Sequence, residues 1–334
     1  MTIRPHVLLL EGEELWRAVE ESFTSSGIVA DTRRGLLDDP KWLSSLYFYD
    51  SKGSQLFEAI CATPEYYPAR TEEAILRDNI DDILTRAGPH LTLAELGSGS
   101  SHKTKVVLQA LVARQGNATY IPVDVSAEFL QQVAAKLEAT HHGLTVHPLA
   151  MQYGEGLSAI GNYPAKRRLV LFLGSSIGNF EPEEQVDLMR RAAANLQPGD
   201  AFLLGTDLVK DPATLEAAYN DRDGWTAKFN RNILDHLNRE LAGDVDAGRF
   251  EHVALWNPRA RRIEMHLEST ANQRMRFPKA ALDVPIKQGE RIHTENSYKF
   301  SMDGVAKLAK ASGFTLEKSW TDANEWFALH LLRR

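Results

Sequence analysis

The sequence predicts an α/β protein in which a parallel sheet is flanked by helices and joined to a second, α+β unit. Short apolar runs alternate with helical segments from Leu91 onward, which is the order of a parallel sheet with right-handed crossovers. Period-two stretches interrupt this order from residue 250. Two apolar runs that flank Asp322-Ala-Asn324 predict a terminal β-hairpin.

Length and composition set bounds on the protein's class. At about 150 residues per domain, 334 residues suggest two domains. A net charge of −7 argues against a nucleic-acid partner, and no stretch approaches the roughly 18 apolar residues that a membrane helix needs. The single cysteine, Cys61, excludes an internal disulfide and a cysteine-based zinc site, and the histidines lack metal-ligand spacing, so we expect no metal. This cysteine usage fits a cytoplasmic protein.

The first third of the chain is helical in pattern. Leu15, Val19 and Phe23 lie four residues apart and predict a helix over residues 13–23. A second helix is predicted over residues 71–87, because Thr71-Glu-Glu begins it and Gly88-Pro89 ends it.

The middle of the chain carries the alternation of strands and helices. The run Leu169-Val-Leu-Phe-Leu173 predicts a buried strand, and Pro182 suits the first position of the helix that follows. The predicted strands cover residues 91–96, 120–124, 144–149, 168–173 and 201–205, and the predicted helices cover 103–112, 127–137 and 182–196.

The rhythm changes after the fifth strand. A long helix over residues 226–242 precedes three period-two stretches, 250–256, 262–267 and 273–277, which predict antiparallel strands in an insertion. Residues 314–320 and 326–332 then form the closing hairpin. Five strand–helix units closed by a hairpin are typical of class I methyltransferases rather than of a plain dinucleotide-binding fold.

Two features favour a nucleoside cofactor. Gly97-Ser98-Gly99 follows the first strand, where glycines let the backbone approach a ligand closely. Asp124 ends the second strand, where an acid can accept both hydroxyls of a ribose. A tight turn and a helix cap are the alternative interpretations. The missing third glycine and the closing hairpin favour S-adenosylmethionine over NAD.

Three further features suit ligand binding. Lys103, just after the glycine loop, opposes the helix dipole but can neutralise the carboxylate of S-adenosylmethionine; a solvated lysine is the alternative. Asn179, in the loop after the fourth strand, suits the carboxylate and amine of an amino acid, with a cap as the alternative. Four tyrosines gather early in the chain and suit a polar pocket or an ordinary core; they are Tyr47, Tyr49, Tyr66 and Tyr67.

Long motifs carry a family resemblance. Pro64-Glu-Tyr-Tyr-Pro-Ala-Arg-Thr71 and Leu173-Gly-Ser-Ser-Ile-Gly-Asn-Phe180 are the longest of them. The others are residues 47–57, 95–104, 205–211 and 229–232. Together they resemble the histidine-specific methyltransferase family of ergothioneine biosynthesis, over residues 35–334.

The resemblance implies a Rossmann-like class I methyltransferase domain, residues 70–209 and 299–334, which binds S-adenosylmethionine. A second, α+β domain, residues 1–69 and 210–298, would complete the substrate pocket. The implied reaction transfers three methyl groups from S-adenosylmethionine to the α-amine of L-histidine and gives hercynine. A fungal branch of the family methylates a prenylated tryptophan, so a tryptophan-type substrate is the alternative. We expect a monomer.

The resemblance also implies the cofactor contacts. The cofactor residues map onto Gly97, Lys103 and Asp124, with Ser98 and Gly99 in the same loop. The family's next cofactor position is an acid followed by phenylalanine, and this chain has Gln152-Tyr153 there. An amide oxygen can still accept a hydrogen bond from the adenine amino group, so we expect binding to survive.

The substrate contacts follow in the same way. Tyr66, Asn179 and Tyr219 map onto the amino-acid backbone, with Tyr49, Phe57 and Gly174 in the same pocket, and Met265, Glu295 and Ser297 map onto the imidazole. Glu295 and Ser297 are two residues apart, so on a strand they share a face and can hold both ring nitrogens. An indole would leave the carboxylate poorly paired, which favours histidine. An ion pair between Glu295 and a lysine on an exposed strand is the alternative.

The reaction is an in-line displacement in which positioning dominates. We expect Asn179 to orient the amine, and Tyr49 or a water molecule to accept its proton.

Overall fold

The computed structural model describes residues 25–334, so the helix predicted over residues 13–23 lies outside the described residues. The described chain divides into two units. The parallel-sheet unit comprises Tyr67–Asp211 and Ser297–Arg334. The antiparallel unit comprises the described residues up to Tyr66 together with Pro212–Asn296. Both units are interrupted in sequence, because Pro212–Asn296 is inserted between the two parts of the parallel-sheet unit.

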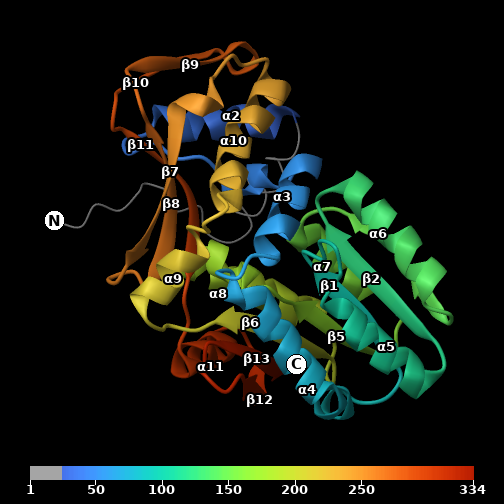
Figure 1. The fold of residues 1–334 in the computed structure, drawn as a ribbon. Coiled ribbons are helices and arrows are strands. Elements are labelled where there is room, and N and C mark those ends of the chain that lie inside the picture. The colour runs from blue at the N-terminus through green and yellow to red at the C-terminus, as the bar shows by residue number, and fades with distance from the viewer. Residues whose placement is uncertain (1–24) are drawn as a thin grey trace. The chain divides into compact units, whose positions relative to one another are not determined.

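An eight-stranded sheet forms the centre of the parallel-sheet unit (Figure 1). Its order is β12-β13-β6-β5-β1-β2-β3, and β4 pairs with β2. The pairs among β1 to β6 are parallel, whereas β13 is antiparallel to both β6 and β12. The closing hairpin and the class I methyltransferase fold are therefore confirmed. The strands are β1 (Leu91–Leu96), β2 (Ala118–Asp124), β3 (Leu144–Val146), β4 (Leu149–Ala150), β5 (Arg167–Phe172), β6 (Ala201–Asp207), β12 (Thr315–Thr321) and β13 (Phe327–Arg333).

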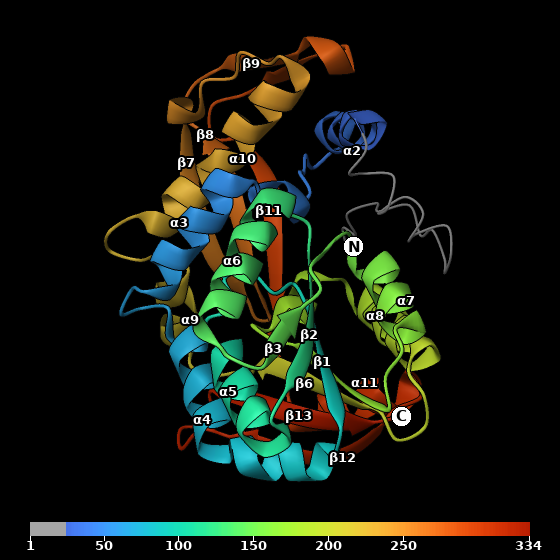
Figure 2. The ribbon, with the colours of Figure 1, turned by 90° about the vertical axis from the view of Figure 1, so that its right-hand side faces the viewer.

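Helices cover both faces of this sheet (Figure 2). Helices α4 and α5 lie on one face, and α7, α8 and α11 lie on the other. Helix α8 begins at Pro182, as predicted, and Glu181 and Glu184 form a capping box there. The helices are α4 (Tyr67–Ala87), α5 (Thr104–Gln115), α6 (Ala127–Thr140), α7 (Tyr153–Asn162), α8 (Pro182–Asn195) and α11 (Met302–Ala311), with a short 3-10 turn, η2 (Ser176–Asn179).

Three elements of this unit differ from the sequence prediction, and one of them is helix α11, which has no predicted counterpart. The strand predicted over residues 144–149 is divided into β3 and β4, because Pro148 cannot donate a backbone hydrogen bond. Helix α7 has no counterpart in the prediction, since its glycines lower helix propensity. Gly156 has no room for a side chain, because an added Cβ would lie 2.6 Å from the Cγ1 of Val123.

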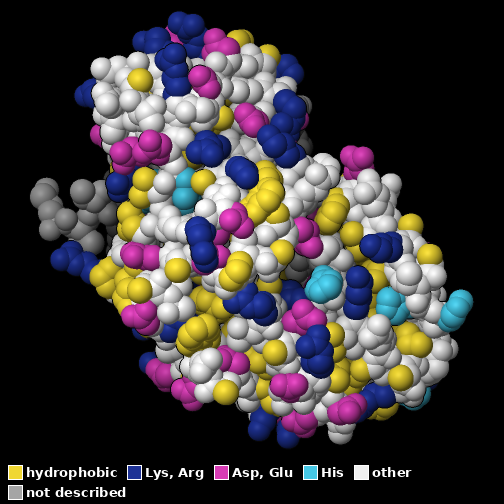
Figure 3. Space-filling model, viewed as in Figure 1, with side chains coloured by type: hydrophobic (Ala, Val, Ile, Leu, Met, Phe, Trp, Pro, Cys, Tyr) yellow, Lys and Arg dark blue, Asp and Glu magenta, His cyan; other side chains and the backbone are white. Residues whose placement is uncertain are grey.

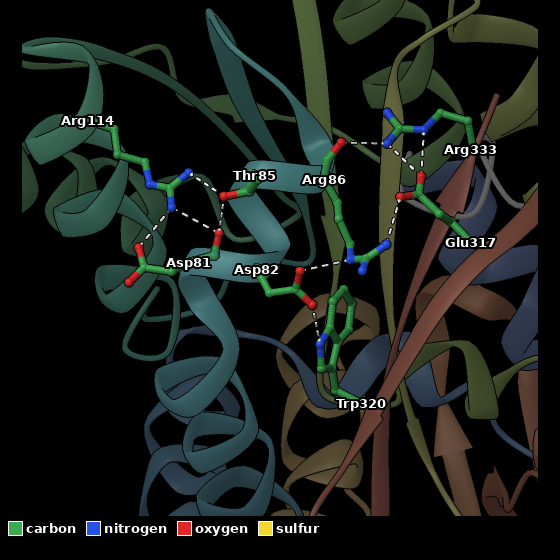
Figure 4. A network of polar contacts seen from close by, with 8 residues as sticks. All are labelled: Asp81, Asp82, Thr85, Arg86, Arg114, Glu317, Trp320 and Arg333. Atoms are coloured by element: carbon green, nitrogen blue, oxygen red, sulfur yellow. Dashed lines mark hydrogen bonds and ion pairs between the residues drawn. The ribbon is translucent and has the colours of Figure 1, made fainter.

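The end of helix α4 is tied to its neighbours by polar contacts (Figure 4). Arg114 of α5 donates to the Thr85 hydroxyl (3.1 Å) and to the backbone carbonyl of Asp81 (2.9 Å). Trp320 of β12 donates to Asp82 (3.1 Å). Arg333 of β13 donates to the backbone carbonyl of Arg86 (2.7 Å). These contacts connect α4 to the closing hairpin and so fix the helix that carries Glu72.

The antiparallel unit combines helices with two small sheets (Figure 1). The long helix and the three predicted strands are confirmed as α10, β7, β8 and β9. Strands β11, β8 and β7 form one sheet, and β10 pairs with β9 in the other. The elements are α2 (Ser25–Leu37), η1 (Ser45–Phe48), α3 (Ser51–Cys61), α9 (Pro212–Ala218), α10 (Trp225–Leu241), η3 (Ala247–Arg249), β7 (Phe250–Asn257), β8 (Arg262–Ser269), β9 (Gln273–Phe277), η4 (Pro278–Ala280), β10 (Leu282–Ile286) and β11 (Arg291–Tyr298).

Helix α3 is fixed to α10 through one carboxylate. Asp50 caps α3 by accepting from the backbone N–H of Gly53 (2.6 Å) and also accepts from the amide of Asn232 (2.8 Å). Arg239 forms an ion pair with the same carboxylate. The motif over residues 229–232 therefore has a structural role in this unit.

Two observations concern possible partners, one on the helices and one on the surface. Among residues 25–334, no helix is long and apolar enough to span a membrane. On the face shown in Figure 3, acidic and basic side chains are interspersed and not separated by sign.

Candidate cofactor and substrate sites

The glycine loop after β1 has the geometry of a ligand-binding turn. Gly97 and Gly99 have φ values of +66° and +49°, in the left-handed region that favours glycine. The N–H groups of Gly97 and Ser98 both bond to the carbonyl of Val123, at 2.8 and 3.1 Å. The Oγ of Ser98 is buried and has no hydrogen-bond partner within the described residues. A bound ligand would satisfy this hydroxyl, so the loop fits a cofactor.

Asp124 ends β2 beside this loop. Its Oδ2 accepts from the N–H of Gly99 (2.9 Å), and its Oδ1 accepts from the N–H of Ser126 (3.1 Å). Burial raises the pKa of Asp124 above its ordinary value, although these N–H groups oppose the shift. The carboxylate therefore stabilises the loop itself, and each oxygen has a second lone pair for the ribose hydroxyls.

Lys103 lies between the predicted cofactor and substrate loops. It is the N-cap residue of α5, and its Nζ forms an ion pair with Glu72 of α4. Glu72 is fully buried and also accepts from the N–H of Gly174 through both oxygens (2.9 Å each). Glu72 is not among the predicted site residues, because the sequence around it indicates only the beginning of a helix. One buried carboxylate thus joins two predicted site residues.

Tyr153 packs against the glycine loop. A Cβ at Gly97 would lie 2.8 Å from the Tyr153 hydroxyl, so these two residues are in close contact. Its ring packs edge-on against Phe172, with centroids 5.3 Å apart. Gln152 is buried and forms the N-cap of α7. The predicted contact between Gln152 and the adenine stays a prediction.

A buried acid also lies behind the loop. Glu95, the fifth residue of β1, accepts from the Thr104 hydroxyl (2.8 Å to each oxygen) and from Tyr120. Burial raises the pKa of Glu95 to about 7, although hydrogen bonds from Tyr120 and Thr104 oppose the shift. This acid connects β1, α5 and β2 and so stabilises the base of the cofactor loop.

The loop after β5 carries Gly174 and Asn179. Gly174 has a φ of +74°. Ser175 also lies in the left-handed region (φ +58°), and its Oγ accepts from the N–H of Asp207 (2.9 Å). A Cβ at Gly178 would lie 2.7 Å from the carbonyl of Tyr298. The chain before Asn179 is therefore packed against the end of β11.

Asp207, at the end of β6, organises a second buried charge cluster. It pairs with Lys299 (2.9 Å) and Lys210 (2.5 Å) and accepts from the Tyr67 hydroxyl (2.8 Å). Lys299 donates to the Ser297 hydroxyl (2.9 Å). Burial alone would raise the pKa of Asp207, but the two lysines hold it below its ordinary value. Asp207 could have been found in the sequence as an acid that ends a predicted parallel strand, as Asp124 does.

Aromatic rings dominate the candidate site of the antiparallel unit. Phe57 is centred 6.1 Å from Tyr49 and 6.0 Å from Tyr66, and Tyr66 is 6.2 Å from Tyr219. The structure thus brings Tyr219 together with three predicted substrate residues of the segment 49–66. Phe229, which was predicted only as part of the family motif over residues 229–232, packs against Tyr49 (5.7 Å) and Phe57 (5.9 Å).

The predicted imidazole-binding residues lie on β8 and β11. Met265, Glu295 and Ser297 are 1%, 8% and 5% exposed. Residues 292 and 294 are buried along β11, then residues 295 and 297, so the alternation slips by one residue after Thr294. The Thr294 hydroxyl donates to the carbonyl of Met265 (3.1 Å), which fixes β11 to β8 at this point.

The fold and these sites define the class of the protein. Within the parallel-sheet unit, the loops at the carboxyl ends of the parallel strands contain glycines and buried charge pairs, and an acid ends β2. This arrangement is typical of a class I methyltransferase that depends on S-adenosylmethionine. No group of three or more His, Cys, Asp or Glu side chains within residues 25–334 is arranged to hold a metal ion.

The comparisons with known proteins place the chain within this class. Residues 28–334 match the family of histidine-specific, S-adenosylmethionine-dependent methyltransferases, and the chain belongs to that family.

Individual relatives agree with this family. A histidine N-alpha-methyltransferase of Mycolicibacterium smegmatis is 44% identical over 305 residues, 91% of this chain and 94% of the relative. A protein of the same name from Mycobacterium tuberculosis is 41% identical, over 90% of this chain and 93% of the relative. A 4-dimethylallyltryptophan N-methyltransferase of Claviceps purpurea is 27% identical, over 90% of this chain and 93% of the relative.

Proposed function

We propose that this protein transfers three methyl groups from S-adenosylmethionine to the α-amine of L-histidine, forming hercynine for ergothioneine biosynthesis. The observation that supports this most directly is the difference in sequence identity to two kinds of relative. The chain is 44% identical to a histidine methyltransferase and 27% identical to a methyltransferase of a tryptophan derivative, over similar shares of its length. Histidine is therefore favoured over the tryptophan-type alternative.

The cofactor is held, in this proposal, by the parallel-sheet unit. Ser98 and Gly99 face the nucleoside with Asp124 on its ribose, and Gln152 contacts the adenine. Lys103 remains near the cofactor carboxylate while it is paired with Glu72. Because Glu72 already compensates its charge, Lys103 contributes directed N–H donors more than net charge.

The amino-acid end of histidine contacts Tyr66, Asn179 and Tyr219. Burial raises the pKa of Tyr66 well above its ordinary value, with Tyr219 adding to the shift. Tyr66 therefore stays protonated and acts as a hydrogen-bond donor, which suits a carboxylate.

The ring end contacts Met265, Glu295 and Ser297. A neutral imidazole has one N–H donor and one acceptor nitrogen. The Glu295 carboxylate suits the donor and the Ser297 hydroxyl suits the acceptor. Because Glu295 is buried, an indole ring would satisfy its carboxylate less well, at a cost of order several kcal/mol.

Each transfer is a displacement at the sulfonium methyl carbon. The lone pair of the amine nitrogen forms the new C–N bond as the C–S bond breaks, and S-adenosylhomocysteine leaves as a neutral thioether. The amine must lose a proton to expose its lone pair before each of the three transfers. Asn179 orients the nitrogen, and the reaction gains most from alignment of the two reactants.

Tyr49 is the proposed proton acceptor, either directly or through water. If it is the base, Tyr49→Phe will lower kcat at least about tenfold near pH 7, and the loss will shrink at higher pH as the free amine becomes more populated. The measurement is kcat against pH from 6 to 9. Full activity across this range would show that Tyr49 only lines the pocket and that water takes the proton.

Mass spectrometry provides the direct test of the proposed function. The enzyme is incubated with S-adenosylmethionine and an equimolar mixture of the twenty amino acids. Histidine that gains three methyl groups is the expected result. Methylated tryptophan would overturn the histidine assignment within the same chemistry. No methylated amino acid would favour a modified substrate or a binding protein without catalysis.

The oligomeric state, the location and the form of the substrate are also part of this proposal. We propose that the enzyme acts as a monomer in the cytoplasm, on a free amino acid. Light scattering of the enzyme with both ligands tests the oligomeric state, and a dimer would contradict it.

A further inference from the structure

We propose that Lys299, held by Asp207, is a positioning residue that fixes the Ser297 hydroxyl as a hydrogen-bond donor to the acceptor nitrogen of the substrate ring. The site would then select a neutral imidazole in one tautomer. This inference rests on the proposed function, because it takes Ser297 to contact the ring.

The contacts of Lys299 lead to this inference. Its ammonium group lies 2.9 Å from the Asp207 carboxylate and 2.9 Å from the Ser297 hydroxyl, and its side chain has no exposed surface. An ammonium group only donates hydrogen bonds, so the Ser297 oxygen must be the acceptor of this one. The hydroxyl proton of Ser297 therefore points away from Lys299.

The position of Lys299 is fixed by the backbone. The N–H of Phe300 donates to the carbonyl of Asp207 (2.8 Å), and the N–H of Val209 donates to the carbonyl of Phe300 (2.9 Å). These bonds form a parallel bridge between Leu208 and Phe300, so the chain after β11 is joined to the end of β6 directly beside the Lys299–Asp207 pair. The lysine therefore has little freedom to turn from Ser297.

Asp207 is held as firmly as Lys299. Tyr67 donates to both of its oxygens, at 2.8 and 2.9 Å. Lys210 contacts the carboxylate and also the Tyr67 hydroxyl (2.6 Å). Since Asp207 is anchored by these partners, it sets the direction of the Lys299 ammonium group and does not follow it.

The chemistry of the ring makes this arrangement selective. A Ser297 proton directed at the ring pairs with an unprotonated nitrogen, whereas an indole N–H or a protonated nitrogen has no acceptor lone pair there. Glu295 would take the remaining N–H, which defines the tautomer.

A substrate pair tests the inference. Histidine and 3-(2-thienyl)alanine are similar in size, but the thiophene ring has no nitrogen. The readout is the ratio of kcat/KM for histidine to that for the thienyl analogue. Ser297→Ala and Lys299→Met should each lower this ratio on the order of tenfold. The double variant should be no lower than either single variant, because both remove the same hydrogen bond.

Lys210→Met is the matched control. Lys210 also pairs with Asp207, but its hydrogen bonds go to Tyr67, Asp207 and the carbonyl of Leu208. It should affect stability and leave the substrate ratio unchanged. If Lys299→Met lowers both kcat/KM values equally, Lys299 is only structural and the inference is wrong. If Lys299→Met does not fold, Lys299→Arg preserves the charge of the pair and should still lower the ratio.

Two outcomes separate this inference from the proposed function. If Ser297→Ala leaves the ratio unchanged while histidine is still trimethylated, the function stands and the inference fails. If the unaltered enzyme does not methylate histidine, the proposed function fails first.

A spectroscopic measurement adds a readout independent of turnover. The ¹⁵N chemical shifts of ring-labelled histidine, bound with S-adenosylhomocysteine, should show one protonated and one unprotonated nitrogen. Two protonated nitrogens would overturn the inference. Lys299→Arg should change the shift of the unprotonated nitrogen, and no change would also contradict it.

Discussion

The two units form their candidate binding surfaces by different means. In the parallel-sheet unit the predicted contacts lie on loops at the carboxyl ends of parallel strands, where backbone groups and buried charges define the surface. In the antiparallel unit they lie mainly on aromatic rings from α3, α10 and the segments beside them. The first kind of surface depends on conformation and charge compensation, and the second depends on shape. Substitutions in the two units should therefore impair binding for different reasons.

We expect the largest effect from a substitution that removes one partner of a buried charge pair in the parallel-sheet unit. Glu72→Gln leaves Lys103 without its anionic partner beside a buried amide, so the free energy of unfolding should fall by about 3 kcal/mol. The affinity for S-adenosylmethionine should fall as well. Chemical denaturation and titration calorimetry measure the two effects.

Glu73→Gln is the control for that substitution. Glu73 is the next residue of α4 and pairs with Arg77 on the surface, where such pairs contribute less than about 1 kcal/mol. Equal losses in the two variants would show that Glu72 has no special role.

The next effect concerns pH and the acid behind the cofactor loop. The pKa of Glu95 is raised to about 7 in the folded protein, from 4.5. The native state therefore binds the proton more tightly, so this stabilisation is complete below pH 4.5 and is lost as pH rises through 7. A shift of this size corresponds to about 3 kcal/mol.

Glu95→Gln should remove this dependence, because the amide does not titrate. The measurement is the free energy of unfolding from pH 4.5 to 8, with the exposed Glu128→Gln as the control. A slope that survives in Glu95→Gln would assign the titration to another group.

A smaller effect sharpens the role of backbone conformation in the cofactor loop. Gly97→Ala and Gly99→Ala both place a side chain in the left-handed region, at about 1–2 kcal/mol each. At Gly97 the new Cβ also meets the Tyr153 hydroxyl, whereas nothing lies within 4 Å of a Cβ at Gly99. Gly97→Ala should therefore weaken binding of S-adenosylmethionine more than Gly99→Ala, by calorimetry.

Tyr153→Phe provides the internal check. It removes the hydroxyl nearest to the added Cβ and should restore part of the affinity in the Gly97→Ala background. If affinity does not recover, backbone strain and not the contact with Tyr153 explains the loss.

The smallest effect tests the proposed ring-binding carboxylate of the antiparallel unit, Glu295. Glu295→Ala removes the carboxylate proposed for the imidazole N–H, so kcat/KM for histidine should fall on the order of tenfold. Use of bulkier aromatic amino acids should rise, because space is created and a buried charge is lost. Competition between histidine and tryptophan measures the change, and unchanged selectivity would contradict the role of Glu295.

The sequence by itself determined the parallel-sheet unit almost element by element. Strand β1 lies where it was predicted, and α8 begins at the predicted proline, because parallel sheets are assembled from local strand–helix units with clear boundaries. The glycine loop and Asp124 were visible for the same reason. The misses are α7, α11 and the division of β3 from β4. In α7 and at the division, glycines and Pro148 weaken the local signal.

Only the tertiary structure decided the remaining partners. The pairing of Glu72 with Lys103 joins residues 31 positions apart, and the pairing of Asp207 with Lys299 joins the two separate parts of one unit. Phe229 joins the aromatic cluster from a helix more than 150 residues beyond Phe57. Local patterns report propensity and periodicity, whereas charge compensation and ring packing depend on which distant segments the fold brings together.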